Sequence, residues 1–187
     1  VPCTDDPTVS GINLTDEYWL LVEKFNFTPT EVLMLIDNGF RSGFIPETMK
    51  KRIRIEAFIK AYEIYQKNGI KIEPHDASFL AYLGITVPPV FTAPPKNPSI
   101  TLDIIKKLPK CDVDCRLIGS VPIPVLYKFY QSSGKNELPT LEEFRAKVAD
   151  DPEQFFAFGK KISKSLLQTE ANIREGVRAI VEEAEND

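Results

Sequence analysis

A proline-rich segment near the middle of the chain limits the possible folds more than any other feature of the sequence. Residues 85–99 read ITVPPVFTAPPKNPS and hold five prolines. Proline removes a backbone donor and disfavours helical geometry in the residue before it, so the segment predicts an extended connector. We place the linker at residues 71–103, within which 77–83 could form a short helical turn. The sequence therefore predicts two structured parts, 1–70 and 104–187.

Helical signals dominate both parts. Thr28 and Glu31 frame a capping box with Pro29 at the first helical position, and Asn38-Gly39 is expected to end that helix. Other helices are expected at 16–25, 46–66, 102–107, 123–131, 140 onward, 151 onward and 170–184. The apolar stripe of the helix at 46–66 is expected to be Ile53, Ile55, Phe58, Ile59, Tyr62 and Tyr65. Alternation at 111–117 indicates a short strand, and another is expected at 2–4. The predicted fold class is therefore predominantly α with one or two short parallel strands.

Composition excludes several functional classes. The 187 residues carry a net charge of -4, so there is no electrostatic case for a nucleic-acid partner. No apolar run reaches the roughly 18 residues of a membrane span, and residues 1–15 do not read as a secretory signal. The odd cysteine count, at Cys3, Cys111 and Cys115, favours a reducing, intracellular compartment, most simply the cytoplasm. His75 is the single histidine, so Cys111 and Cys115 lack the partners of a zinc knuckle.

Two short stretches carry candidate functional residues. Asp5 and Asp6 follow a short apolar run. Of two adjacent carboxylates at such a position, one can bind a metal and the other can contact a polar atom of the substrate. The same Asp-Asp-Pro run is also ordinary turn chemistry. In the second stretch, LPKCDVDCRLIGSV at 108–121, alternation places Asp114 and Arg116 on one face. Arginine stays cationic and cannot bind zinc. The strand is therefore either a metal-binding strand that has lost its ligands or an edge strand whose charged face is exposed.

These stretches together resemble the adenosine deaminase family. LPKCDVDCRLIGSV is similar to the family's first barrel strand, PK-x-E-L-H-x-H-L-D-G-S, and Thr4-Asp5-Asp6-Pro7 is similar to its last-strand motif. Residues 10–23 resemble the segment after that last strand, and 42–52 resemble the family's C-terminal helix region. Residues 138–149 and 166–170 resemble its N-terminal helices more weakly. Residues 1–70 resemble the C-terminal part of the barrel and 104–187 its N-terminal part, in inverted order. The resemblance implies a fragment-like portion of a (β/α)8 TIM barrel, with two strands that are neighbours in the closed ring.

The resemblance also implies roles for individual residues. Asp5 takes a metal-ligand position, whereas Asp114 and Arg116 stand where the family has two metal histidines. The family's third zinc histidine, general acid glutamate and water-assisting histidine have no counterpart here. The resemblance therefore marks vestigial metal-type positions at Asp5, Asp114 and Arg116, vestigial substrate-type positions at Asp6, Ile118 and Gly119, and Asp5 alone as a candidate metal ligand.

Three functions follow as alternatives. The first is a non-catalytic structural or interaction module of a larger assembly, derived from an adenosine deaminase, with protein partners or neighbouring barrel segments and no cofactor. The second is a piece of a tandem or split zinc-dependent adenosine deaminase, completed by other chains and acting on a purine nucleoside. The third is an autonomous enzyme of unrelated mechanism that uses Asp5, Asp6 or Cys115. We expect the first, with no enzymatic activity of the chain on its own.

Overall fold

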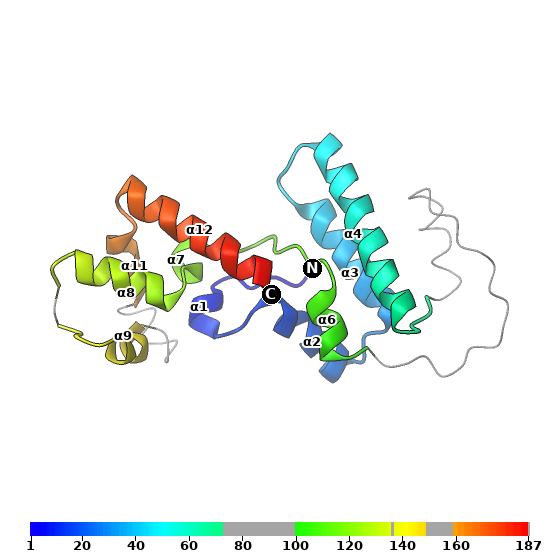
Figure 1. Ribbon diagram of the computed structural model, residues 1–187, viewed down its shortest axis with the longest axis horizontal. Helices are drawn as coiled ribbons and strands as arrows, with labels where there is room; N and C mark the ends of the chain where they lie inside the picture. Colours follow the sequence, from blue (N-terminus) through cyan, green and yellow to red (C-terminus); the bar gives the residue numbers. More distant parts are fainter. Residues whose placement is uncertain (73–99, 136, 149–158, 187) are drawn as a thin grey trace. The chain divides into compact units, whose positions relative to one another are not determined.

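The computed structural model describes residues 1–72, 100–135, 137–148 and 159–186 (Figure 1). The centre of the expected linker, His75 and the helix expected from residue 151 lie outside the described residues. The chain forms two compact units that are interleaved in the sequence. Unit 1 comprises Val1–Pro2 and Leu14–Val113, and unit 2 comprises Cys3–Asn13 and Asp114–Asp187. The predicted boundaries at 70 and 104 concern sequence likeness and stay a prediction.

Unit 1 is built from helices. They are α2 (Leu14–Phe25), α3 (Pro29–Ser42), α4 (Glu47–Lys67) and α6 (Leu102–Lys107). Helix α3 packs along α4, and α6 contacts both α2 and α4. The core of the unit includes Tyr18, Ile36, Phe58, Tyr65 and Ile105, all buried. The positions expected for all four helices agree with the structure to within two residues at each end, except for the end of α3.

The start of α3 follows the expected capping box, but its end does not follow the sequence signal. The Glu31 backbone N–H donates to Thr28 Oγ1, and the Thr28 backbone N–H donates to the Glu31 carboxylate. The expected stop at Gly39 is wrong, because α3 continues to Ser42. A Cβ at Gly39 would lie 3.1 Å from the Cys111 carbonyl oxygen. The glycine therefore permits close packing inside the helix rather than ending it.

The buried face of α4 differs from the expected apolar stripe. Ala57, Phe58 and Tyr65 are buried, whereas Ile59 is 41% exposed. The face also includes Arg54, whose Nε and Nη2 atoms each donate to one Asp37 carboxylate oxygen at 2.8 Å. Because this pair lies on the face that packs on α3, a charged residue occupies a position that apolar periodicity alone would not assign to the core.

Unit 2 is also helical. Its elements are α1 (Pro7–Ser10), α7 (Leu117–Ser120), α8 (Ile123–Ser132), α9 (Leu141–Val148), α11 (Lys160–Leu166) and α12 (Glu170–Asn186). Phe144 is fully buried against Tyr127 and Tyr130, with ring centroids 5.5 and 5.2 Å apart. The expected capping box at Thr140 is present, because the Glu143 backbone N–H donates to Thr140 Oγ1 and the Thr140 backbone N–H donates to the Glu143 carboxylate.

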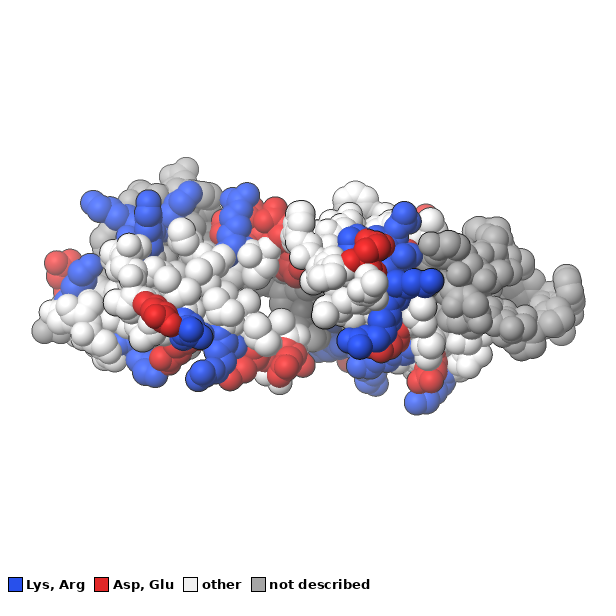
Figure 2. All heavy atoms as spheres, turned by 90° about the horizontal axis from the view of Figure 1, so that it is seen from above, with Lys and Arg blue, Asp and Glu red and all other residues white. Residues whose placement is uncertain are grey.

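The expectation of a predominantly helical chain is confirmed, whereas the expected strands are wrong for the described residues. In place of strands there is an isolated parallel bridge between Asp5 and Cys115. Parallel strands are stable in sheets that have further strands and helices on both faces, and neither segment has such neighbours here. Figure 2 shows acidic and basic side chains interspersed on the face that it draws. No described helix is both long and apolar enough to cross a membrane.

Candidate functional site

The parallel bridge between Asp5 and Cys115 brings the two candidate stretches together. The Asp5 N–H donates to the Asp114 carbonyl at 2.8 Å, and the Arg116 N–H donates to the Asp5 carbonyl at 2.8 Å. Asp5 has a φ of 57°, in the left-handed region. Aspartate is one of the few non-glycine residues that adopt this region with any frequency, and such positions cluster at functional sites. The bridge therefore places Asp5 and Arg116 side by side, although the stretches are far apart in sequence.

Arg116 is the centre of an acidic cluster that we call the Arg116 cluster: Arg116, Asp5, Asp6 and Asp114. Its Nε atom lies 2.8 Å from Asp5 Oδ1 and 4.0 Å from Asp114 Oδ1, and its Nη1 atom lies 3.9 Å from Asp6 Oδ2. Asp5 Oδ1 is buried but takes part in no aligned hydrogen bond, so its contact with the guanidinium is an ion pair. One cation thus faces three carboxylates.

Asp6 is the most enclosed carboxylate of the cluster, with 17% of its side chain exposed. It packs directly on Gly119 in α7, where an added Cβ would lie 1.9 Å from Asp6 Oδ1. Burial raises the pKa of Asp6 above its ordinary value, and the neighbouring Asp5 raises it further. Arg116 and Lys160 act in the opposite direction by favouring the charged carboxylate. Glycine at position 119 is therefore what makes room for the Asp6 carboxylate.

The thiol next to the cluster is engaged in a hydrogen-bond chain. Cys115 Sγ donates to Ser120 Oγ at 3.1 Å, and Ser120 Oγ donates to the Arg116 carbonyl at 2.6 Å. Cys115 is exposed and, like the other two cysteines, free of a disulfide. The thiol hydrogen therefore points to Ser120, and the hydrogen-bond chain ties Cys115 to the backbone at Arg116.

The residues of the Arg116 cluster do not fit a zinc ion. Zinc needs several protein ligands, and an arginine guanidinium cannot act as one. In the described part of the chain, no group of three or more His, Cys, Asp or Glu side chains is placed to hold a metal. Gly119 lies against Asp6, and Ile118 is half-buried in the same helix, α7. The arrangement can neutralise carboxylates, but it offers no metal-bound water.

Comparison with known proteins identifies the sequence class. A probable adenosine deaminase of Dictyostelium discoideum is 32% identical over 194 residues, which cover 94% of this chain and 25% of that protein. The chain is adenosine deaminase-like in sequence. Adenosine deaminases of Serratia proteamaculans and Yersinia pseudotuberculosis are 35% and 36% identical over 51 and 55 residues, which are 15% and 16% of those proteins. No family model and no solved structure matches this adenosine deaminase-like chain.

The adenosine deaminase-like chain spans a quarter of the length of its Dictyostelium relative. The sequence resemblance found Asp5, Asp6, Asp114, Arg116 and Gly119, which lie together, and it also marked Ile118, a half-buried residue of α7. Sequence reasoning missed a group of lysines in unit 1, described below. Their signal was present in the spacing of Lys60 and Lys67, seven residues apart and therefore on one face of a helix.

Proposed function

We propose that this adenosine deaminase-like chain is a non-catalytic segment, a pseudoenzyme portion of a larger deaminase-related assembly, in which Arg116 takes the place of the catalytic metal. The observation that carries the proposal is the guanidinium within 4.0 Å of all three cluster carboxylates. Two unit charges of the same sign 4 Å apart repel by about 4 kcal/mol at the effective dielectric of a protein surface, and a dication doubles this. Arg116 and a zinc ion therefore compete for the same carboxylates.

The same chemistry argues against deamination by this segment. Zinc-assisted attack on a purine needs an activated water and a residue that shuttles protons. In the Arg116 cluster the carboxylates already face a permanent cation, and the cluster itself contains no histidine. The role that we propose for the cluster is therefore structural, because it joins the start of the chain to α7. Protein partners or neighbouring barrel segments would complete the fold.

A second candidate is supported by the Dictyostelium comparison. One alignment crosses 94% of this chain, so the two blocks occur in the Dictyostelium protein in the same order as in this chain. The two relatives also differ in total length. The 194 aligned residues are 25% of the Dictyostelium protein, and the 55 aligned residues are 16% of the Yersinia protein, so the Dictyostelium protein is more than twice as long. Both facts fit a tandem array in which the end of one barrel precedes the start of the next. In that case zinc and a purine nucleoside would belong to the completed barrels.

The test measures metal content and adenosine turnover of the purified chain together. We expect no stoichiometric zinc and no deamination. The double variant Asp114→His with Arg116→His restores the family's histidine pair and should gain zinc affinity while remaining inactive, because the general acid is still missing. A matched variant, Asp112→His with Lys110→His, keeps Arg116 and should gain none.

Stoichiometric zinc together with adenosine turnover in the unchanged chain would overturn the proposal. Adenosine turnover by the material that copurifies with the chain separates the two candidates. Turnover by a larger complex that contains the chain, and loss of that turnover when the chain is removed, would favour the tandem or split deaminase.

A further inference from the structure

The geometry points to a second site in unit 1, a cavity between α4 and α6 that binds an anion carrying several phosphate groups. We call it the lysine cavity. It has a volume of about 640 Å³ and is lined by Lys60, Ile64, Lys67, Asn68, Lys106 and Lys107. This volume falls within the roughly 300–1,000 Å³ of small-molecule sites. Four of its lining residues are cationic and none is acidic.

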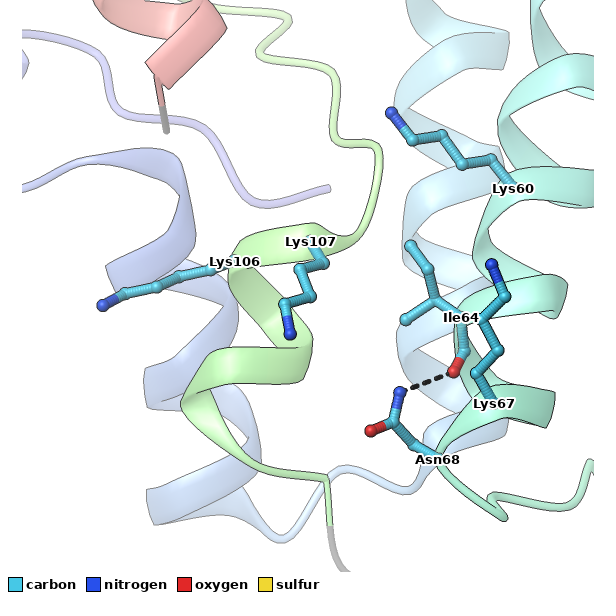
Figure 3. A pocket seen from close by; sticks show the side chains of 6 residues that line it. All are labelled: Lys60, Ile64, Lys67, Asn68, Lys106 and Lys107. Atoms are coloured by element: carbon cyan, nitrogen blue, oxygen red, sulfur yellow. Dashed lines mark hydrogen bonds between the residues drawn. The ribbon is translucent and has the colours of Figure 1, made fainter.

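The orientation of the lysines singles out three of them. Figure 3 shows Lys60 and Lys67 coming from α4 and Lys107 from the facing α6, whereas the Lys106 side chain projects from the opposite side of α6. The Asn68 side-chain amide is already used, because its Nδ2 donates to the Ile64 carbonyl at 2.7 Å. The site therefore presents the ammonium groups of Lys60, Lys67 and Lys107 and an apolar wall at Ile64.

The lysines of the cavity differ from several other lysines of the chain in their ion pairing. Other lysines form ion pairs: Lys50 with Glu47 and Lys128 with Glu175. The lysines of the cavity have no ion-pair partner among the described residues. Cations of like sign around one cavity repel one another, and an anion that enters relieves the repulsion.

The number of charges selects the class of anion. Lysine binds phosphate as a point charge, and three ammonium groups around one cavity match an anion with about three negative charges. A single phosphate would contact one or two of the three and fill a small part of the cavity. A di- or triphosphate chain carries enough negative charge to neutralise all three. The cavity lies in unit 1 and the Arg116 cluster in unit 2, so this inference stands apart from the proposed function.

The test is calorimetric titration of the full chain with inorganic tripolyphosphate at physiological ionic strength. We expect saturable one-to-one binding. Lys60→Gln with Lys107→Gln should weaken it about tenfold or more, because two charge-assisted contacts are lost. The control pair, Lys51→Gln with Lys161→Gln, changes the net charge equally at exposed lysines outside the cavity and should leave the affinity within about twofold.

The source of the phosphate chain is separated by a parallel titration with ATP. Equal affinities for ATP and tripolyphosphate assign recognition to the phosphate chain alone, and tighter binding of ATP extends the site to a nucleotide. Circular dichroism of each variant confirms that the helices persist. Absence of saturable binding, or an equal loss in the cavity pair and the control pair, would overturn the inference, since both results mean that only diffuse charge attracts the anion.

Discussion

Gly119→Ala tests whether the Arg116 cluster depends on the close packing of Asp6 on α7. The added Cβ would lie 1.9 Å from Asp6 Oδ1, 2.4 Å from its Cγ and 2.5 Å from its Cβ, so Asp6 must move. Overpacking of this kind costs about 1–3 kcal/mol, and alanine in a helix returns up to about 1 kcal/mol relative to glycine. The expected net loss is about 1 kcal/mol, located in unit 2.

Hydrogen exchange measured by mass spectrometry places this loss within the chain. A loss of about 1 kcal/mol lowers protection about fivefold, and we expect this in α7 and α8 but not in α3, which belongs to unit 1. A second readout is the pKa of Asp6, measured by NMR. Burial raises that pKa, so a carboxylate pushed into solvent should titrate closer to its ordinary value of 3.8.

The matched rescue is Asp6→Gly combined with Gly119→Ala. Alanine at position 6 is insufficient, because the Asp6 Cβ itself lies 2.5 Å from the added methyl group. The double variant should therefore recover most of the protection that Gly119→Ala removes. Unchanged exchange in α7 together with an unchanged Asp6 pKa in the Gly119→Ala protein would refute the packing argument.

Two further predictions concern unit 1. Asp37→Ala removes the carboxylate that accepts two hydrogen bonds from the buried Arg54 guanidinium, and it should lower the free energy of unfolding by about 3–5 kcal/mol in urea denaturation. Asp37→Leu with Arg54→Met should be close to neutral, and a small effect of the single change would contradict a stabilising buried pair. Hydrogen bonds from Thr28 lower the pKa of Glu31 in the folded chain. The ionised Glu31 carboxylate therefore stabilises the fold at pH values above its ordinary pKa of 4.5, and this stabilisation is lost as the pH falls through the lowered pKa of the folded chain. Glu31→Gln should flatten that acid loss in thermal unfolding, and an unchanged pH profile would count against the capping box as its cause.

The helices were predictable because their signals are local. The capping boxes at Thr28 and Thr140 involve residues three positions apart, and both form as expected. Gly39 shows the limit of such reasoning. Read locally, it ends a helix, but its neighbour in space is Cys111, about seventy residues later in the chain, which no local pattern reveals. Arg54 was missed for a similar reason, since its partner lies on another helix.

The candidate site was predictable only in part. The resemblance gave Asp5, Asp6, Asp114 and Arg116, and their proximity is what neighbouring barrel strands would produce. The strands themselves did not form in the described residues, because one parallel bridge lacks the surrounding sheet. The ion pairs of Arg116 depend on side-chain geometry, which sequence alone cannot supply. The functional role of each cluster residue stays a prediction.

Unit 2 is built from two segments that are far apart in the sequence, and this separation affects how the chain folds. The segment Cys3–Asn13 joins a unit whose other residues begin at Asp114, and unit 1 interrupts it in the sequence. The Thr8 hydroxyl donates to the Val121 carbonyl across 113 residues. Closing a flexible loop of that length costs on the order of 4 kcal/mol, whereas an already folded insert shortens the loop. Unit 1 is thus expected to fold before unit 2. Any substitution that slows the folding of unit 1 should therefore also slow the refolding of unit 2.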